Sequence, residues 1–501
     1  MEEFHLYALL VTLTLIIPAF LFTFNPKNIK KKSPPSPPTL PIIGNLHQLG
    51  PIIHRSLHHL SQTYGPVMLL KFGSKPVLVI SSADAAREAT RTHDLAFSNR
   101  PDLRTMRQLF CDLKDPINLP YGDKWRALRA IFVHELLGPA RVRSFDSVRE
   151  SEVSLLMERL GRRSPARPAD LTAEFATLNN NLICRTAFGE KTVNVERVLE
   201  VIDRVVDMLS KFRVGDFVPW LAWIDGLTGF DAARAHLSRD IDDILETVLE
   251  DHLSRKEGVD KDNFMDILLG IYKGDVRGVS IDRVTVKAMI FDVIGAGTET
   301  SAKALMWIMT ELIRHPHVMK KLQDEVRGVT EGKTVITEDD IQRMPYLKAV
   351  IKESLRIHPP FPIYLHEARE HVNFMGYDVE PETIVLMNVW AIGQDRAFWK
   401  DPERFIPERF VDSSVDYRGF DFQLLPFGAG RRICPGIGFA AMGMEHTVAN
   451  LVKNFDFELP GGARVEDLDV TERPGFAVGK KEPLVVVPRR VEVGSRSGLE
   501  E

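Results

Sequence analysis

The stretch PFGAGRRICPG, from Pro426 to Gly436, places one cysteine among glycines, prolines and arginines. Its glycines permit close approach of the backbone to another group, and the positive charges of Arg431 and Arg432 favour the thiolate form of Cys434 over the thiol. A thiolate in such a loop can serve as a nucleophile or as an axial metal ligand. A nucleophile needs a base and an orienting partner, and no histidine lies near the loop in the sequence.

The axial-ligand interpretation uses more of the residues in this loop. A haem iron accepts a single thiolate, and an arginine can then pair with a haem propionate. The loop also matches the pattern F-x-x-G-x-R-x-C-x-G, through which the chain resembles the cytochrome P-450 superfamily; the matching residues are Phe427, Gly430, Arg432, Cys434 and Gly436. The resemblance implies that haem b is the cofactor, that Cys434 is the axial iron ligand, and that Phe427, Arg432 and Gly436 contact the haem.

A long helix is predicted from about Ile281 to Arg314, because a proline two residues later would end it. Within this helix the sequence AGTETS begins at Ala296, and three small residues that start at Gly295 leave a site without large side chains. That gap can admit a small ligand, or it can serve tight packing of two helices. The resemblance implies that Glu299 and Thr300 deliver protons during oxygen activation.

Three charged residues are predicted to secure the cysteine loop from a distance. Glu353 and Arg356 stand three residues apart on a helix predicted from about Tyr346 to Ile357, where an isolated pair contributes only about 0.2–0.5 kcal/mol. The resemblance supplies a partner, Arg409 in FIPERF, and implies a buried network of the three residues. An earlier PERF sequence begins at Pro402, but the later copy fits better in its F-x-PERF context and in its distance to the cysteine.

The same resemblance assigns further residues to the haem and to the substrate. Trp125 and Arg129 in GDKWRALRA, and His366 after HPPFPIYL, are implied to contact a haem propionate. The substrate pocket is implied to be apolar with aromatic walls, formed by Phe291, Asp292, Ala296, Phe361, Ile363 and Phe476. Asp292 either orients a hydroxyl or an amine of the substrate or is simply hydrated.

The segment from Phe4 to Phe24 contains no Asp, Glu, Lys or Arg and has about the length that a helix needs to cross a bilayer. An acidic start and basic residues after the segment favour an uncleaved anchor over a signal peptide and leave the remaining chain in the cytosol. The predicted organisation is a membrane anchor at residues 1–25, a basic and proline-rich hinge at 26–45, a haem-thiolate catalytic domain at 46–490 and a flexible tail at 491–501.

The body of the chain is predicted to be mainly α with small β-sheets, and the resemblance implies the cytochrome P-450 fold with an N-terminal transmembrane helix. GPVMLLKFG and KPVLVISS read as a strand pair joined at Gly73 and Ser74. Helical periodicity dominates from about Arg143 to Leu322. A tryptophan-rich segment from Phe217 to Ile224 fits a core position and a membrane interface equally well.

Composition narrows the function classes. The net charge of -5 gives no indication of nucleic-acid binding. Three scattered cysteines are too few for a disulfide scaffold, form no zinc-binding cluster and favour a reducing compartment. The chain carries no nucleotide-binding fingerprint, so any electrons for its chemistry must come from a separate protein.

The hinge, FSNRP, AGTETS and the cysteine loop resemble the plant A-type, clan seventy-one-like group of the superfamily. The resemblance implies anchoring in the endoplasmic reticulum membrane and electrons from NADPH through a separate cytochrome P-450 reductase, with cytochrome b5 as a second candidate donor. It implies a monooxygenase that uses O2 to oxidise a small lipophilic metabolite such as a terpenoid, a phenylpropanoid or coumarin, or an alkaloid. Two alternatives stay open: a haem-thiolate isomerase or dehydratase that acts on hydroperoxides without a reductase, and a non-catalytic haem-binding scaffold.

Overall fold

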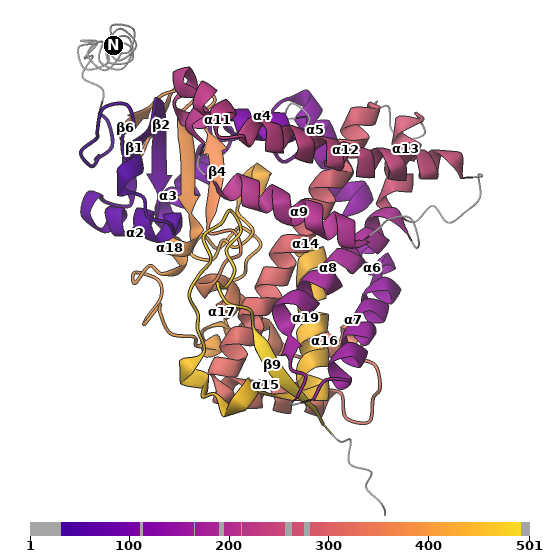
Figure 1. Cartoon of the computed structure of the whole chain (residues 1–501). Coiled ribbons are helices and arrows are strands. Elements are labelled where there is room, and N and C mark those ends of the chain that lie inside the picture. The colour runs from indigo at the N-terminus through magenta and orange to yellow at the C-terminus, as the bar shows by residue number, and fades with distance from the viewer. Residues whose placement is uncertain are drawn as a thin grey trace, which may run out of the picture.

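The structure, a computed structural model, describes residues 32–110, 114–164, 166–189, 195–211, 213–255, 263–274 and 281–491. The predicted membrane anchor, the first part of the hinge and the tail after residue 491 lie outside these ranges. Of the helices that the described residues form, none has both the length and the apolar composition needed to cross a membrane. As predicted, the fold is mainly α with small β-sheets (Figure 1).

Helices of very different length make up most of the described chain. The longest are α8 (Leu171–Phe188), α12 (Phe230–Ser254), α14 (Arg283–Arg314) and α19 (Ile437–Asn454). Helices of intermediate length are α2 (Ile53–Tyr64), α7 (Asp146–Gly161), α9 (Val195–Ser210), α13 (Phe264–Tyr272), α15 (Pro316–Val329) and α17 (Pro345–Ile357). The short helices are α3 (Ala83–Arg87), α4 (Arg104–Leu109), α5 (Asp123–Ala130), α6 (Pro139–Ser144), α10 (Val214–Phe217), α11 (Trp223–Leu227), α16 (Glu338–Gln342) and α18 (Val389–Gly393).

Helix α14 runs through the middle of the helical part and packs along α8 (Figure 1). It begins where the Asp282 carboxylate accepts a hydrogen bond from the Thr285 N–H at 2.7 Å, a cap that typically contributes about 1 kcal/mol. It ends at Arg314, and Pro316 opens the next helix, α15. The prediction of a helix from about Ile281 to Arg314 is therefore confirmed.

The largest sheet has four strands in the order β1-β2-β7-β4. The predicted strand pair is confirmed as β1 (Val67–Phe72) and β2 (Lys75–Ile80), which pair antiparallel across a turn in which Gly73 has a φ of 57°. Strand β7 (Ile384–Asn388) lies parallel to β2 and antiparallel to β4 (Ile363–Glu367). The sheet thus joins the N-terminal hairpin to the segment that follows α17.

Two smaller sheets complete the β structure of the described chain. One has the order β3-β9-β8, and the other pairs β5 with β6. Their strands are β3 (Ala169–Asp170), β8 (Phe455–Glu458), β9 (Val485–Arg490), β5 (Val372–Phe374) and β6 (Tyr377–Val379). Because β3 precedes α8 and β9 ends the described chain, this sheet fixes the C-terminal segment against the helical part.

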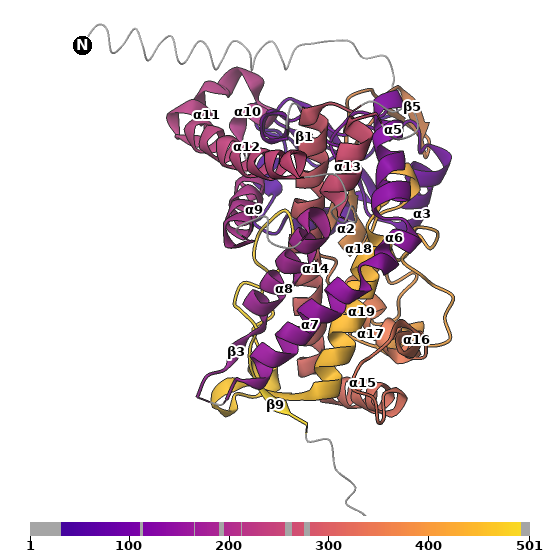
Figure 2. The same cartoon turned by 90° about the vertical axis from the view of Figure 1, so that its right-hand side faces the viewer.

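The cysteine loop leads directly into α19, which packs against α7, α15 and α17 (Figure 2). Most of the side chains that α19 directs inward are buried among those helices. Cys434 lies three residues before the first residue of α19, so a rigid helix in the core sets its position. In α14 the residues from Gly295 to Ser301 form the other side of the site described below.

Candidate active site

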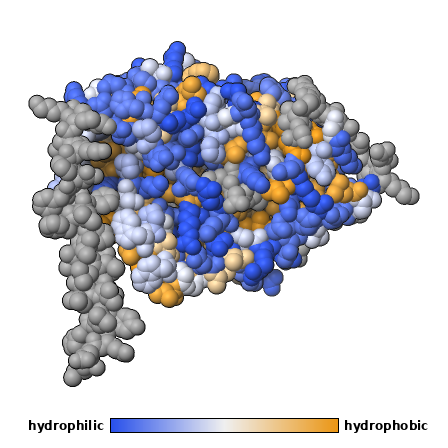
Figure 3. Space-filling view, turned by 90° about the horizontal axis from the view of Figure 1, so that it is seen from above, coloured by the Kyte–Doolittle hydropathy of each residue, from blue (hydrophilic) through white to orange (hydrophobic). Residues whose placement is uncertain are grey.

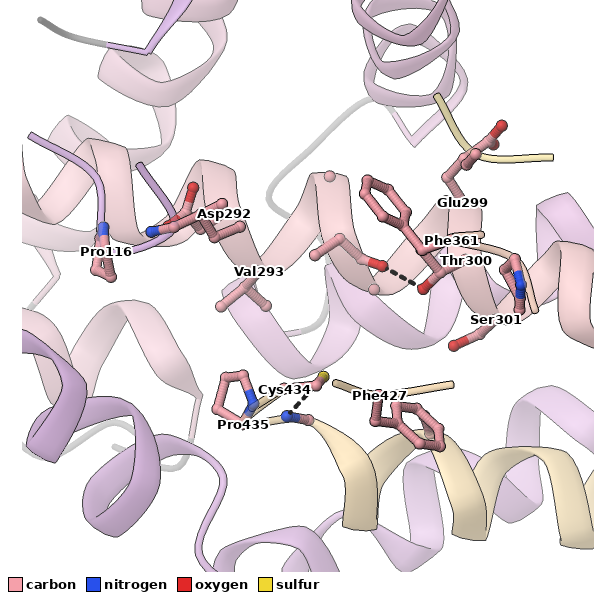
Figure 4. A pocket seen from close by; sticks show the side chains of 18 of the residues that line it. Pro116, Asp292, Val293, Glu299, Thr300, Ser301, Phe361, Phe427, Cys434 and Pro435 are labelled. Atoms are coloured by element: carbon pink, nitrogen blue, oxygen red, sulfur yellow. Dashed lines mark hydrogen bonds between the residues drawn. The ribbon is translucent and has the colours of Figure 1, made fainter. Parts of the chain in front are cut away.

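A cavity of about 400 Å³ lies between α14 and the cysteine loop. Figure 4 shows α14 with Thr300 on one side of the cavity and Cys434 on the other. Most predicted site residues line it: Trp125, Arg129, Phe291, Asp292, Ala296, Glu299, Thr300, Phe361, Phe427, Arg432, Cys434, Gly436 and Phe476. Residues more than 300 positions apart in the sequence therefore form one site.

The cysteine loop presents the sulfur of Cys434 to the cavity. Gly428 and Gly430 have φ angles of 75° and 66°, which disfavour any residue with a side chain. At Gly430, a side chain would also collide with the backbone oxygen of Thr90, 2.6 Å from the position of its Cβ. The Cys434 N–H donates to the Phe427 carbonyl at 2.9 Å, and the Gly436 N–H donates to Cys434 Sγ at 3.3 Å.

The charges around Cys434 differ from the prediction. Burial raises the pKa of the Cys434 thiol, while the Gly436 hydrogen bond and the positive charge of Arg129 lower it. Arg431 is instead paired with Asp94 at 2.7 Å, and Arg432 donates to backbone carbonyls. Arg129, not the two arginines of the loop, is thus the cation that favours the thiolate, and coordination to a metal ion would deprotonate the thiol outright.

Three arginines converge on one end of the cavity: Arg100, Arg129 and Arg432. Burial, together with the charges of Arg100 and Arg129, lowers the pKa of Arg432 to about 8. Burial likewise lowers the pKa of Arg100 to about 10, and that of Arg129 is also lowered. Cations packed together away from water call for anionic partners.

Haem fits this arrangement, since it offers an iron for the thiolate and two propionates for the arginines. Trp125 belongs to the same end of the cavity: its indole N–H donates to the Pro116 carbonyl at 3.1 Å, and the Arg432 guanidinium lies 4.4 Å from the centre of its ring. Gly436 beside Cys434, and Gly295 and Gly297 on α14, border the cavity without side chains. The donor set is a single sulfur with surrounding cations, which is typical of a haem-thiolate site and not of a structural metal site.

Thr300 lies in the groove of α14 on the cavity side. Its hydroxyl donates to the Ala296 carbonyl one turn earlier, at 2.6 Å (Figure 4). This bond fixes the hydroxyl oxygen at the cavity surface and leaves its lone pairs able to accept a hydrogen bond from a molecule in the cavity.

The small residues of α14 serve both tight helix packing and open space in the cavity, the two roles that the sequence left open. A Cβ atom at Gly297 would lie 2.5 Å from Ile183 Cδ1 of α8, so this glycine permits tight packing of two helices. A Cβ atom at Gly295 would meet only Ile202 Cδ1, at 3.8 Å, and this residue borders the cavity.

The Glu299 carboxylate is turned away from Cys434 (Figure 4). It forms an ion pair with Lys303, one turn further along α14. The Lys303 ammonium also donates to the Ala477 carbonyl at 2.9 Å. Glu299 is therefore held beside the C-terminal loop that carries Phe476, at the edge of the cavity.

Aromatic side chains form much of the cavity wall. Phe361 packs edge-on against Phe476 with 4.4 Å between ring centres, and Phe110 lies 5.9 Å from Phe291. Ile363, which we predicted in the pocket, does not line the cavity but packs with the side chains beneath the four-stranded sheet. Its neighbours Tyr364 and Leu365 on β4 line the cavity in its place.

His366 is placed differently from the prediction. It does not line the cavity, and its Nδ1 lies 3.0 Å from the Phe97 carbonyl. Burial, and then the charge of Arg100, lower the pKa of His366 to about 3, so the ring is neutral. A neutral imidazole held by a backbone carbonyl gives no charge to a propionate.

Glu353 and Arg356 form a fully buried ion pair on α17, with two hydrogen bonds of 2.7 and 2.8 Å. Arg409 reaches the same carboxylate at 3.2 Å. Arg356 also donates to the carbonyls of Gly393, Pro402 and Arg404. The three charged residues thus clamp the chain between residues 393 and 409, which leads towards the cysteine loop.

Two charged residues in and beside the site, Arg100 and Asp115, were not predicted from the sequence. Arg100 lies in FSNRP, which we used only as a mark of resemblance. Asp115 stands beside Asp292 in the fold. No local pattern points to Asp115, because its partner lies 177 positions further along the chain.

The fold and the site together define a mainly helical protein whose cavity, lined by Cys434 and three arginines, fits a haem. The cytochrome P450 family matches residues 34–487, and the chain belongs to this family. Haem with its iron is the cofactor, and the family assigns the chain to the haem-thiolate monooxygenases.

Relatives of similar length cover nearly the whole chain. Norfluorocurarine oxidase from Strychnos sp is 46% identical over 96% of this chain and 97% of its own. (+)-Menthofuran synthase from Mentha piperita is 44% identical over 96% of this chain and 98% of its own. Psoralen synthase from Ammi majus is 47% identical over 92% of this chain and 92% of its own. A solved structure of zebra fish cytochrome P450 with abiraterone superimposes with a TM-score of 0.75 at 25% identity and covers 88% of this chain and 99% of that one.

Proposed function

We propose that this chain inserts one oxygen atom from O2 into a small lipophilic plant metabolite, such as a terpenoid, a phenylpropanoid or coumarin, or an alkaloid. One observation carries the proposal: Cys434 Sγ faces Thr300 across an apolar, aromatic-walled cavity (Figure 4). Such a cavity suits a small hydrophobic molecule. Relatives named for norfluorocurarine, menthofuran and psoralen support the substrate class.

Each element of the site receives a role in this proposal. Bound haem supplies the iron centre at which O2 is activated, and Cys434 donates electron density to it. Arg100, Arg129, Arg432 and Trp125 hold the propionate end, while Phe427 and Gly436 flank the sulfur. The aromatic side chains exclude water and orient the substrate. We give His366 a smaller role at the haem, because its Nδ1 is engaged with the Phe97 carbonyl and only Nε2 remains for a propionate.

Thr300 and Glu299 are proposed to manage the protons. The Thr300 hydroxyl donates its own hydrogen to the Ala296 carbonyl. Its oxygen lies on the cavity surface, where it can accept a hydrogen bond and so hold a proton-donating molecule in place. Glu299 sits at the edge of the cavity, where its side chain is 14% exposed and forms an ion pair with Lys303. Passage of protons from Glu299 past Thr300 would connect the outside to the reacting centre.

Replacing Thr300 with alanine is expected to divert electrons from product to hydrogen peroxide. A positioned proton donor contributes about 10²-fold or more to such a step, so product formed per NADPH should fall at least about tenfold. The measurement is the ratio of product, peroxide and NADPH consumed with a separate reductase. Thr300→Ser keeps the hydroxyl and should stay near the wild-type ratio. An unchanged ratio in Thr300→Ala would remove Thr300 from proton delivery.

We infer that the electrons come from NADPH through a separate cytochrome P-450 reductase, with cytochrome b5 as a second candidate donor. The absence of a nucleotide fingerprint from the sequence supports an external donor. We also retain the division into anchor (1–25), hinge (26–45), catalytic domain (46–490) and tail (491–501) as a proposal. The family match to residues 34–487 supports the extent of the catalytic domain.

We further propose that the catalytic domain rests on the cytosolic face of the endoplasmic reticulum membrane through α11 and the residues around it. Trp220, Trp223 and Leu227 are 42%, 62% and 77% exposed. The preceding Phe217 carbonyl accepts the Ser74 N–H at 2.8 Å, which ties this segment to the β1–β2 turn near the hinge. The face that carries α11 is hydrophilic with scattered apolar patches (Figure 3).

Brominated lipids should quench the fluorescence of Trp220 and Trp223 when the full-length protein is reconstituted in vesicles. Tryptophan favours the headgroup level of a bilayer. The chain has six tryptophans, and the other four are buried: Trp125, Trp307, Trp390 and Trp399. A variant with phenylalanine at positions 220 and 223 should lose most of the quenched signal. Equal quenching in the variant and the wild type would contradict contact through this segment.

A further inference from the structure

Asp115 and Asp292 bring two carboxyl groups together in the interior. Their exposed fractions are 1% and 4%. Asp292 Oδ2 accepts the Ile117 N–H at 3.1 Å, and Asp115 Oδ2 accepts two hydrogen bonds from Asn118, at 2.9 and 2.8 Å. In both residues the second oxygen, Oδ1, is buried and receives no hydrogen bond from any N–H or hydroxyl of the described residues.

The two carboxyl groups lie within hydrogen-bonding reach of each other. Burial and the charge of Asp115 raise the pKa of Asp292 well above its ordinary value, and burial raises the pKa of Asp115 to about 6. Two buried carboxylates in contact do not both ionise near neutral pH. A single proton, donated by Asp292 and accepted by Asp115, satisfies both of the oxygens that otherwise lack a donor.

Residues 115–119, which Asp292 contacts through the Ile117 N–H, also form hydrogen bonds with two of the three buried arginines. Arg100 Nε donates to the Ile117 carbonyl at 3.1 Å, and Arg432 Nη2 donates to the Leu119 carbonyl at 2.7 Å. The same segment contributes Pro116, Ile117 and Asn118 to the cavity wall. Residues 115–119 therefore connect the haem-binding end of the cavity to the substrate-binding helix α14.

The charges at this end balance when the pair holds one proton. The cations are Arg100, Arg129 and Arg432, and the negative charge of Asp115 works against the lowering of the pKa of Arg100 and of Arg432. The two propionates of a haem and one ionised aspartate supply three negative charges against these three. A second ionised aspartate would leave an unpaired buried charge, which is costly.

We propose that Asp115 and Asp292 share one proton and act as positioning residues, which fasten residues 115–119 to α14. This acid pair fixes the cavity wall on one side and the carbonyl groups that hold the arginines on the other. Both oxygens of Asp292 are engaged, so Asp292 positions the wall and does not act as a counter-ion for an amine in the substrate. Only the charge count depends on the proposed haem-binding role of the arginines.

The test compares the wild-type holoprotein with Asp292→Asn from pH 5 to pH 8. Asparagine keeps the shape and both hydrogen bonds, because its oxygen can accept from Ile117 and its N–H can donate to Asp115, but it carries no titrating proton. The folded wild type retains a proton that an unfolded aspartate loses above pH 4, so raising the pH lowers the stability of the wild type relative to the variant. The ratio of the two unfolding equilibrium constants should rise by up to about tenfold per pH unit, until the pH passes the raised pKa.

Thermal unfolding midpoints give this comparison without any turnover, so a failure of the proposed function would not affect it. All variants carry the same arginines, whose titration cancels in the difference. A difference between the two proteins that does not change with pH would overturn the shared proton. Asp292→Leu removes both hydrogen bonds and should lower the midpoint and the retention of haem at every pH. If Asp292→Leu matched the wild type in both, the positioning role would be wrong; if it did not fold, the asparagine comparison alone would decide.

Discussion

Replacing Arg356 with leucine is expected to lower the free energy of unfolding by about 3–5 kcal/mol, because it removes one partner of a fully buried ion pair. Both side chains of the pair, Glu353 and Arg356, are completely buried. The leucine would leave the Glu353 carboxylate with only Arg409 as a cationic partner. It would also strip hydrogen bonds from the carbonyls of Gly393 and Pro402. The midpoint of denaturant unfolding measures the loss.

An exposed ion pair gives the matched control. Arg162 and Glu158 are 3.5 Å apart on one face of a helix end, and both are more than half exposed. Arg162→Leu should change the free energy of unfolding by less than about 1 kcal/mol. Arg356→Lys should still be destabilised, since a lysine cannot make the two parallel bonds to the carboxylate. A wild-type midpoint for Arg356→Leu would show that the network does not secure the fold, and Glu353→Gln provides a milder test if the leucine variant does not accumulate.

Local chemistry made the main elements of the fold predictable. Gly73 and Ser74 between two largely apolar runs predicted the hairpin, and the proline after His315 predicted the end of α14. The pairing of β2 with β7 joins residues about 300 positions apart, and no local pattern specifies that register. The tryptophan-rich segment proved to be divided: Phe217 packs against Phe72 at 5.9 Å, whereas Trp223 is largely exposed.

The site was predictable where a motif carried the chemistry and not where the fold assembled it. Cys434 and Thr300 could be found from the residues around them. The predictions for Ile363 and His366 differ from the structure because the fold decides which side chains of β4 reach the cavity, and those are Tyr364 and Leu365. The effect of Arg129 on the pKa of Cys434 was also not predictable, because the two residues are about 300 positions apart in the sequence. The pairing of Asp115 with Asp292, which are also distant in the sequence, was not predictable for the same reason.

Cys434→Ala should abolish the cysteine-ligated haem site altogether. Alanine offers no sulfur to the iron, while the surrounding glycines, Arg129 and Arg432 stay in place, so any haem that still binds must take a different axial ligand. Monooxygenase turnover should be lost with it, because a haem held there would lack the thiolate ligand that this chemistry requires. Cys184→Ala is the matched control, since Cys184 is buried on α8 away from the cavity.

The absorption spectrum of the reduced carbon monoxide complex tests the central claim most directly. We predict the thiolate-type band in the purified wild type and in Cys184→Ala, and its complete absence in Cys434→Ala. A Cys434→Ala protein that retained the thiolate-type band would contradict the assignment of Cys434 as the haem ligand.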